Sequence, residues 1–312
     1  QQHRGKTDKT ILVGRERAYH GVGFGGISVG GLPGNKKHFS LLENVDHICA
    51  THNLEKNAFS KGQPEWGKEL ANDLLRVIEK YGADKIAAFI TEPLAGSTGV
   101  LIPPKGYLER IREICTEHDI LLIFDEVITG FGRLGAPFAA QYFNVEPDLI
   151  TCAKGLTSGT VPMGAVMVKK EIYDAFQDRG PMVIDLFHGY TYSAHPLAAG
   201  ALIATLDVYQ EDELFKHAKE MSSYWEDALH SLRDTKHVID VRNLGLVAGV
   251  EMETRDGKPG ARGYDVFTDG FHNHNILLRF TGDTLALSPP LIAGKEHIDQ
   301  MVDVLRKIIP IH

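Results

Sequence analysis

The sequence of 312 residues predicts an α/β protein with a mostly parallel central sheet, helices on both faces of that sheet, and a smaller α+β unit at the C-terminal end. Three observations support this fold class. Helical and strand patterns alternate strictly from Trp66 to Ala153, which is typical of βαβ units. Two short apolar runs in that region stop at a charged residue, Asp125 and Lys154, as buried strands do at their ends. After His195 the pattern changes to long helices followed by further strands.

The elements of the larger unit follow from local patterns. Amphipathic spacing predicts a helix over Lys68–Tyr81, and the apolar run Ile86–Thr91 predicts the strand that follows it and ends at Glu92-Pro93. The same reasoning gives the next elements: a helix over Tyr107–His118, a strand over Ile120–Phe124, a helical segment over Phe138–Phe143, a strand over Leu149–Ala153, and a strand over Met163–Lys169 that is a candidate for antiparallel pairing.

A chain of this length is long enough for two domains. We expect residues 1–198 to form the large domain, which binds the ligand, and residues 199–312 to form a connecting helix and the small α+β domain. The elements predicted after the boundary are helices over Leu197–Tyr209 and Leu214–Leu232 and strands within His237–Glu251 and Ile276–Leu287.

Composition and charge narrow the functional classes. Lysine and arginine total 33 against 41 aspartate and glutamate, a net charge of −8 without a basic stripe, so nucleic acid is not an expected partner. The three scattered cysteines favour a reducing, cytoplasmic location. No apolar run approaches the roughly 18 residues of a membrane span, so no membrane association is expected. The histidine pairs lack a convergent third ligand, and we expect no metal site.

Asp125 and Lys154 carry the chemical prediction. Side chains at the carboxyl ends of parallel strands converge on the crevice where ligands bind, so the two strands deliver an acid and an amine to one pocket. Pyridoxal phosphate needs this pair: a lysine amine forms a Schiff base with its aldehyde, and a carboxylate keeps its ring nitrogen protonated. Taken singly, Asp125 with Glu126 could equally be a surface pair, and most lysines are solvated.

A glycine pattern from Gly21 to Gly26 satisfies the dinucleotide fingerprint GxGxxG. The residues that follow, 27–34, include three glycines and a proline and are not expected to open a helix. Without a helix N-terminus there is no pyrophosphate site, so we expect no dinucleotide here.

Four motifs, in order and at characteristic separations, resemble those of class III aminotransferases of pyridoxal phosphate fold type I. The resemblance is greatest to the ω-amino acid:pyruvate (β-alanine:pyruvate) branch and extends from about Ile11 to the C-terminus. The motifs are Glu92-Pro93-Leu94, the run Asp125 to Arg133, Ala153-Lys154-Gly155, and the run His188 to Pro196.

This resemblance implies roles for individual residues. Lys154 would form the internal aldimine and transfer the proton during the reaction, Asp125 would hold the pyridinium, and Val127 would pack on the ring. Tyr19 would stack on the opposite ring face. Thr191 would reach the cofactor phosphate of a neighbouring subunit, which implies a homodimer or a tetramer with the active site at the subunit interface.

The resemblance also bears on substrates. Arg279 corresponds to the arginine that binds a substrate carboxylate, for which a planar guanidinium is well suited. Relatives that use 2-oxoglutarate carry a glutamate where this chain has Ser97, and the missing carboxylate favours pyruvate as the amino acceptor. The predicted reaction moves an amino group from an ω-amino acid or amine to pyruvate.

Two other readings remain open. The chain could be another class III pyridoxal phosphate enzyme, either an aminomutase or a decarboxylating aminotransferase. The N-terminal part of the family chain, with its phosphate-binding glycine-rich loop, is expected to be missing before Gln1. A catalytically inactive, truncated fragment is therefore the third reading.

Overall fold

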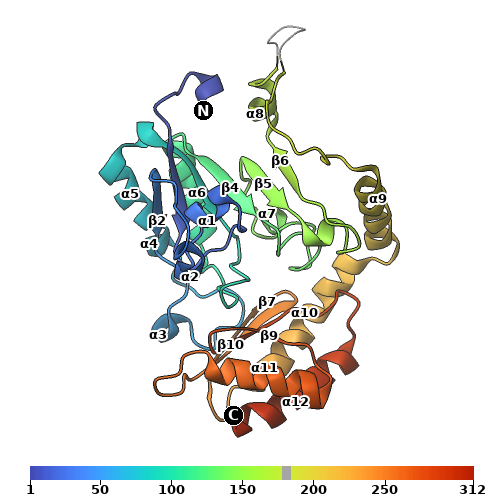
Figure 1. Cartoon of the computed structure of the whole chain (residues 1–312). Helices are drawn as coiled ribbons and strands as arrows, with labels where there is room; N and C mark the ends of the chain where they lie inside the picture. Colours follow the sequence, from blue (N-terminus) through green and yellow to red (C-terminus); the bar gives the residue numbers. More distant parts are fainter. Residues whose placement is uncertain (178–183) are drawn as a thin grey trace.

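The computed structural model describes residues 1–177 and 184–312, which contain two sheets (Figure 1). The larger sheet has the strand order β2-β1-β3-β4-β5-β6, and all its neighbours pair in parallel except β5 with β6. The smaller sheet, β7-β8-β10-β9, is antiparallel. The predicted fold class is therefore confirmed, including the antiparallel pairing of the strand predicted over Met163–Lys169.

The helices and strands have the following bounds. The strands are β1 (Ile11–Arg15), β2 (Val45–Ile48), β3 (Ile86–Thr91), β4 (Leu121–Asp125), β5 (Leu149–Cys152), β6 (Ala165–Val168), β7 (Val238–Leu244), β8 (Val247–Met252), β9 (Arg279–Thr281) and β10 (Thr284–Leu287). The α-helices are α1 (Phe24–Val29), α2 (Pro33–Lys36), α3 (Leu54–Asn57), α4 (Lys68–Ala71), α5 (Asp73–Tyr81), α6 (Tyr107–Glu117), α7 (Ala139–Tyr142), α8 (Lys170–Asp174), α9 (Pro196–Glu211), α10 (Leu214–His230), α11 (Ala261–His274) and α12 (Lys295–Ile308).

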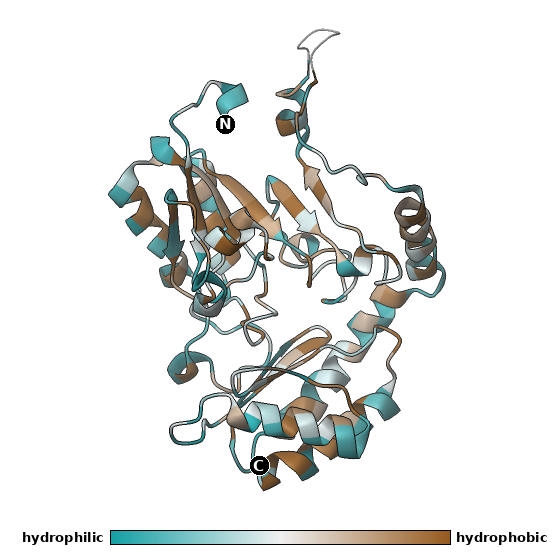
Figure 2. Cartoon of the chain, in the orientation of Figure 1, coloured by the Kyte–Doolittle hydropathy of each residue, from teal (hydrophilic) through white to brown (hydrophobic). Residues whose placement is uncertain are grey.

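The core of the large unit lies between the central strands and the helices on their faces. Phe89 of β3 and Leu122 of β4 are fully buried, as are Val77 of α5 and Ile111 of α6. In Figure 2 these strands are largely brown, whereas the helices mix brown and teal, as expected when one face of a helix meets a sheet. Because these strands are buried along their length, residues that bind a ligand are expected at the strand ends.

The small unit has an apolar core of its own. Trp225 of α10, Val266 of α11 and Leu305 of α12 are fully buried against the antiparallel sheet. Helix α9 precedes this unit, and Figure 1 shows α10 running from it down to the small sheet. The proposed boundary at residue 199 falls inside α9, and the division into domains at that point stays a prediction.

Two local predictions differ from the structure. The helix predicted over Lys68–Tyr81 is divided at Asn72 into α4 and α5. The expectation that no helix opens after the GxGxxG pattern is wrong, because α1 starts at Phe24 with Gly23 as its N-cap. The pattern has a packing reason at Gly26, where a β-carbon would come within 2.2 Å of the His20 carbonyl oxygen.

Among the described residues, no helix combines the length and apolarity that crossing a membrane requires.

Candidate active site

Asp125 and Lys154 stand at the ends of two adjacent strands. Asp125 is the last residue of β4 and lies beside Thr151 of β5 in the parallel register, and Lys154 follows β5 by two residues. The strand-end argument made from the sequence therefore places both side chains at the same edge of the sheet.

Asp125 is buried, and both of its carboxylate oxygens are engaged. One oxygen lies 2.8 Å from Nδ1 of His20, and the other accepts the backbone N–H of Val127 at 3.1 Å. His20 follows β1, and its side chain is only 2% exposed, with Nε2 buried and without a hydrogen-bond partner in the described structure. A carboxylate has acceptor capacity beyond two hydrogen bonds, so Asp125 can still receive a donor from a ligand.

Lys154 begins a short 3₁₀ turn in an unusual backbone conformation. Its φ of 47° is left-handed, a conformation that costs a residue other than glycine about 1–3 kcal/mol and is found more often at functional sites. The next residue must be glycine, because a β-carbon on Gly155 would lie 2.8 Å from the side chain of Phe131. The fold thus holds the lysine at the strand end at a conformational cost.

The amine of Lys154 has an altered acidity. Solvent reaches the side chain, but the surrounding protein atoms lower its pKa by desolvation, and the Arg279 guanidinium lowers the pKa further. Asp125 and Glu92 oppose this effect and raise it. The net result is a lysine that loses its proton more readily than an ordinary one, as a nucleophilic or proton-transferring amine requires.

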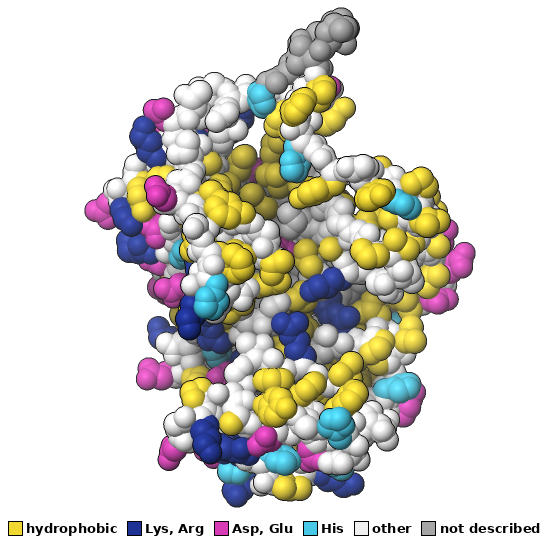
Figure 3. Space-filling view, viewed as in Figure 1, with side chains coloured by type: hydrophobic (Ala, Val, Ile, Leu, Met, Phe, Trp, Pro, Cys, Tyr) yellow, Lys and Arg dark blue, Asp and Glu magenta, His cyan; other side chains and the backbone are white. Residues whose placement is uncertain are grey.

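A cavity of about 690 Å³ contains both Lys154 and Arg279, and its volume is within the roughly 300–1,000 Å³ range of small-molecule sites. Figure 3 shows a hollow between the two parts of the molecule, with Lys and Arg side chains in it. The cavity is lined by Lys154, Val127 and Ser97 from the large unit and by Arg279 from β9. Four residues singled out from the sequence therefore meet in one place.

Three predicted residues do not line this cavity. Asp125 lies behind it and is represented in the lining by Val127, whose backbone N–H it accepts. Tyr19 follows β1, where its backbone N–H donates to Glu92 at 2.9 Å beside the His20–Asp125 pair. Its stacking role stays a prediction. Thr191 is exposed in the loop before α9, and its predicted role in another subunit also stays a prediction.

The sequence reasoning missed three residues of this site. The sequence pattern gives His20 no role, because its contact with Asp125 depends on the strand order β1-β3-β4. Glu92 stands out in the sequence only as part of a motif, yet it is buried and its carboxylate accepts the N–H groups of Tyr19 and Gly96. Arg133 lines the cavity and donates to the carbonyl oxygens of Leu246 and Pro289, so it connects the two units.

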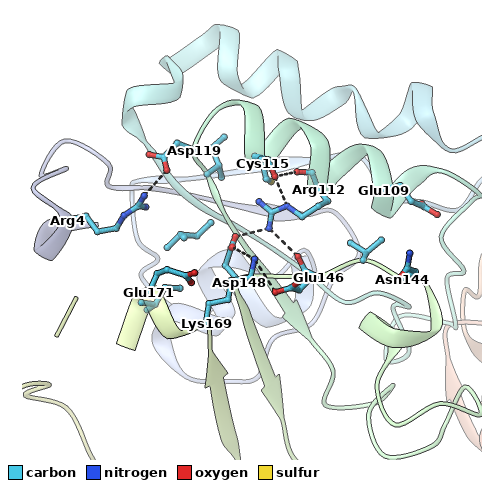
Figure 4. Close-up of a pocket in the computed structure, with 15 residues that line it drawn as sticks. Arg4, Glu109, Arg112, Cys115, Asp119, Asn144, Glu146, Asp148, Lys169 and Glu171 are labelled. Carbon is cyan, nitrogen blue, oxygen red and sulfur yellow. Dashed lines mark hydrogen bonds and ion pairs between the residues drawn. The ribbon is translucent and has the colours of Figure 1, made fainter. Parts of the chain in front are cut away.

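Two other clusters of charged residues are compensated by ion pairs within the protein. Figure 4 shows a second pocket, where Arg112 and Lys169 pair with Asp148 at 2.8 and 3.3 Å at the opposite ends of the strands. A separate group of His52, Asp240 and Glu251 has the donor atoms of a metal site. The guanidinium of Arg242 contacts both of these carboxylates, so their charge is already compensated.

The residues present fit pyridoxal phosphate. The cavity offers an amine with a lowered pKa for the aldehyde. The adjoining carboxylate of Asp125 retains acceptor capacity for a protonated ring nitrogen, and Val127 supplies an apolar surface beside it. A lysine and an aspartate on neighbouring ends of a mostly parallel sheet, beside a small α+β unit, define the class of fold type I pyridoxal phosphate enzymes.

Comparisons with known proteins agree with this class. The family model described as aminotransferase class-III matches residues 1–309. The chain is 62% identical to an ω-aminotransferase of Caulobacter vibrioides, over 98% of this chain and 70% of that protein. It is 47% identical to a β-alanine–pyruvate aminotransferase of Pseudomonas aeruginosa, over 97% of this chain and 68% of that protein. A solved transaminase structure with L-alanine superposes with a TM-score of 0.90 at 33% identity, covering 99% of this chain and 74% of that one.

The chain belongs to the class III aminotransferase family. The predictions of a pyridoxal phosphate enzyme and of an aminotransferase are thereby confirmed.

The charged groups around Lys154 shift its pKa, so removing one of them should change the pH at which the amine becomes reactive. Replacing Arg279 by glutamine removes a positive charge and is expected to raise the pKa of Lys154, whereas Asp125→Asn is expected to lower it. Competitive acetylation of the cofactor-free protein, followed by peptide mass spectrometry, measures the pH at which Lys154 is half-reactive. Exposed Lys170 in the same digest is the internal reference. Shifts in the same direction for both variants would contradict this account of the site.

Proposed function

We propose that this aminotransferase moves an amino group from an ω-amino acid or amine to pyruvate. The observation that carries the proposal is the position of Arg279: its guanidinium lines the cavity of Lys154 and forms no ion pair with any residue in ranges 1–177 and 184–312. An unpaired guanidinium is a ready site for a substrate carboxylate, which it can bind through two parallel hydrogen bonds. Relatives named ω-aminotransferase and β-alanine–pyruvate aminotransferase support the same substrate class.

Lys154, Asp125 and His20 have different proposed roles in the reaction. When bound, pyridoxal phosphate supplies the electron-accepting ring that lets a C–H bond beside the amine be broken. The Lys154 amine, with its lowered pKa, takes and returns the proton as general base and acid. Asp125 is proposed to hold the positive charge on the ring nitrogen, and His20 keeps that carboxylate oriented through the 2.8 Å contact.

Ser97 supports pyruvate over a larger dicarboxylate. Its carbonyl oxygen accepts a hydrogen bond from the Thr281 hydroxyl, so this loop lies against the strand that carries Arg279. A glutamate at position 97 would put a carboxylate near the guanidinium and compete with substrate. With serine there, Arg279 is open to the carboxylate of a small keto acid.

A second copy of this chain is the proposed partner. Apolar and aromatic side chains are exposed along α9 and the loop before it, including Phe187 (86% exposed), Tyr190 (80%), Leu197 (71%) and Ile203 (61%). Figure 3 shows apolar side chains gathered over this side of the molecule. A patch of this kind marks an interface, and Thr191 lies within it. We propose a homodimer, as the unit or within a tetramer, in which Thr191 serves the partner's active site.

The reaction is tested by its products. Transamination from β-alanine or an amine to pyruvate forms alanine, whereas an aminomutase leaves pyruvate unchanged and a decarboxylating enzyme releases carbon dioxide from the donor. We expect alanine in proportion to donor consumed, measured by chromatography with the cofactor-loaded protein. No alanine from any donor would contradict the proposal.

Arg279→Gln is expected to raise KM for pyruvate by about 10- to 100-fold, because a charge-assisted hydrogen bond to a carboxylate contributes about 1.5–3 kcal/mol. At a pH high enough to deprotonate Lys154 in both proteins, an amine donor without a carboxylate should react at the same rate in the variant. The control is Arg76→Gln, which removes an exposed arginine paired with Asp73 far from the cavity. An unchanged KM for pyruvate in the Arg279 variant would assign carboxylate binding elsewhere.

A further inference from the structure

The loop from Ser97 to Val100 is held in an unusual way. Each of its four backbone carbonyl groups accepts a hydrogen bond from a side chain of another segment. Thr281 donates to Ser97 at 2.9 Å, Arg17 donates to Thr98 at 3.2 Å, and Arg242 donates to Gly99 and Val100. This loop lines the cavity of Lys154 through Ser97 and Val100, so its position is set by residues far away in sequence.

Two of these three side chains come from the small unit, but they act at different points. Arg242 belongs to β7 and fixes the Gly99–Val100 end of the loop, where it is also paired with Asp240 and Glu251. Thr281 belongs to β9, the edge strand of the small sheet that also carries Arg279, and fixes the Ser97 end of the loop. The two anchors are therefore not equivalent.

Thr281 and Arg279 share one face of β9. They are two residues apart on the same strand, and side chains alternate between the faces of a sheet with a period of two. The Thr281 hydroxyl reaches the large unit and Arg279 lines the cavity, so both point away from the small core. Within the described residues, Thr281 makes the one side-chain hydrogen bond from β9 to the large unit.

The turn that follows Thr281 is tied to the small unit. Asp283, in the turn to β10, accepts the backbone N–H groups of Gly260 and Gly263 at the start of α11. This arrangement fixes the turn against a helix of the small unit, and the Thr281 hydroxyl ties the same end of β9 directly to the large unit.

We propose that Thr281 is a positioning residue for carboxylate recognition: its hydroxyl ties β9 to the Ser97 carbonyl and thereby fixes how far the Arg279 guanidinium lies from Lys154. This inference rests on the proposed function, because it gives Arg279 the task of binding a substrate carboxylate. Loss of the tie lets β9 move outward, which weakens binding of carboxylate substrates and leaves the amine chemistry at Lys154 intact.

The test uses Thr281→Val, which keeps the β-branched shape and removes the hydroxyl, in the cofactor-loaded protein. We expect KM for pyruvate to rise about 3- to 10-fold, the equivalent of one hydrogen bond, with kcat changed less than about twofold. A single-turnover reaction with an arylalkyl amine, which has no carboxylate, should keep its rate. Thr281→Ser restores the hydroxyl and should restore KM. Thr268→Val, which removes a hydroxyl–carbonyl contact on the surface of α11, is the matched control.

A double-mutant cycle separates this inference from the proposed function. If Thr281 acts through Arg279, Thr281→Val should have no further effect on KM for pyruvate in the Arg279→Gln background. Additive effects, or equal losses with pyruvate and the arylalkyl amine, would overturn the positioning role while leaving Arg279 in place. If Arg279→Gln itself has no effect on KM for pyruvate, the proposed function is contradicted, whatever the result for Thr281→Val.

Discussion

Replacing Lys154 by alanine is expected to lower the turnover of an amine with pyruvate by at least about 10⁴-fold. A positioned general acid and base contributes about 10²–10⁴-fold by itself, and this variant also loses the attachment point for the cofactor aldehyde. Steady-state formation of alanine at saturating cofactor measures the loss. The fold should survive, because the side chain is open to solvent at the mouth of the cavity.

A matched lysine controls for the change of residue. Lys85→Ala removes an exposed lysine that pairs with Asp8 at 2.9 Å outside the cavity. Surface pairs of this kind contribute about 0–1 kcal/mol, so turnover should stay at the wild-type level. If Lys154→Ala retained turnover within about tenfold of that control, another group would have to move the proton.

Asp125→Asn is expected to lower kcat by about 10²–10³-fold, the effect of losing one preorganised electrostatic contact at the reacting centre. The amide keeps the size of the side chain and an oxygen that can accept the Val127 N–H, so the change removes mainly the negative charge. The spectrum of the bound cofactor should change as well, since its ring nitrogen loses a charged partner.

The same substitution at Asp148 is the control. Asp148 is half-buried, accepts the Leu122 N–H at 2.8 Å and pairs with Arg112, but it lies at the opposite ends of the strands. Asp148→Asn should leave kcat unchanged at temperatures below the melting point, which is measured for both variants. Equal losses in the two variants would show that the effect of Asp125 is structural.

The fold was predictable where one local pattern dominated. The strand over Ile86–Thr91 is apolar up to its last residue, and its predicted bounds match β3. Strand β1 gave no such signal, because Gly14 and the fully buried Arg15 interrupt its apolar run. Strand β2 is short and carries Asp46 and His47 near the sheet edge, a sequence that reads equally well as a loop.

The site was predictable where chemistry and strand ends coincide. Asp125 and Lys154 follow consecutive strands of the alternating region, so the sequence order alone brings them together. His20 follows β1, and its contact with Asp125 requires the strand order β1-β3-β4, which the sequence does not state. The Thr281–Ser97 contact is even harder to predict from the sequence, because its two residues are 184 positions apart and belong to different units.

Borohydride reduction of the cofactor-loaded protein, followed by peptide mapping, tests the central claim most directly. Reduction fixes the cofactor on the amine that holds it. The predicted result is a pyridoxyl mass on the peptide that contains Lys154, and on no other peptide. A pyridoxyl group on a different lysine, or none on any peptide under conditions where alanine is formed, would contradict the account.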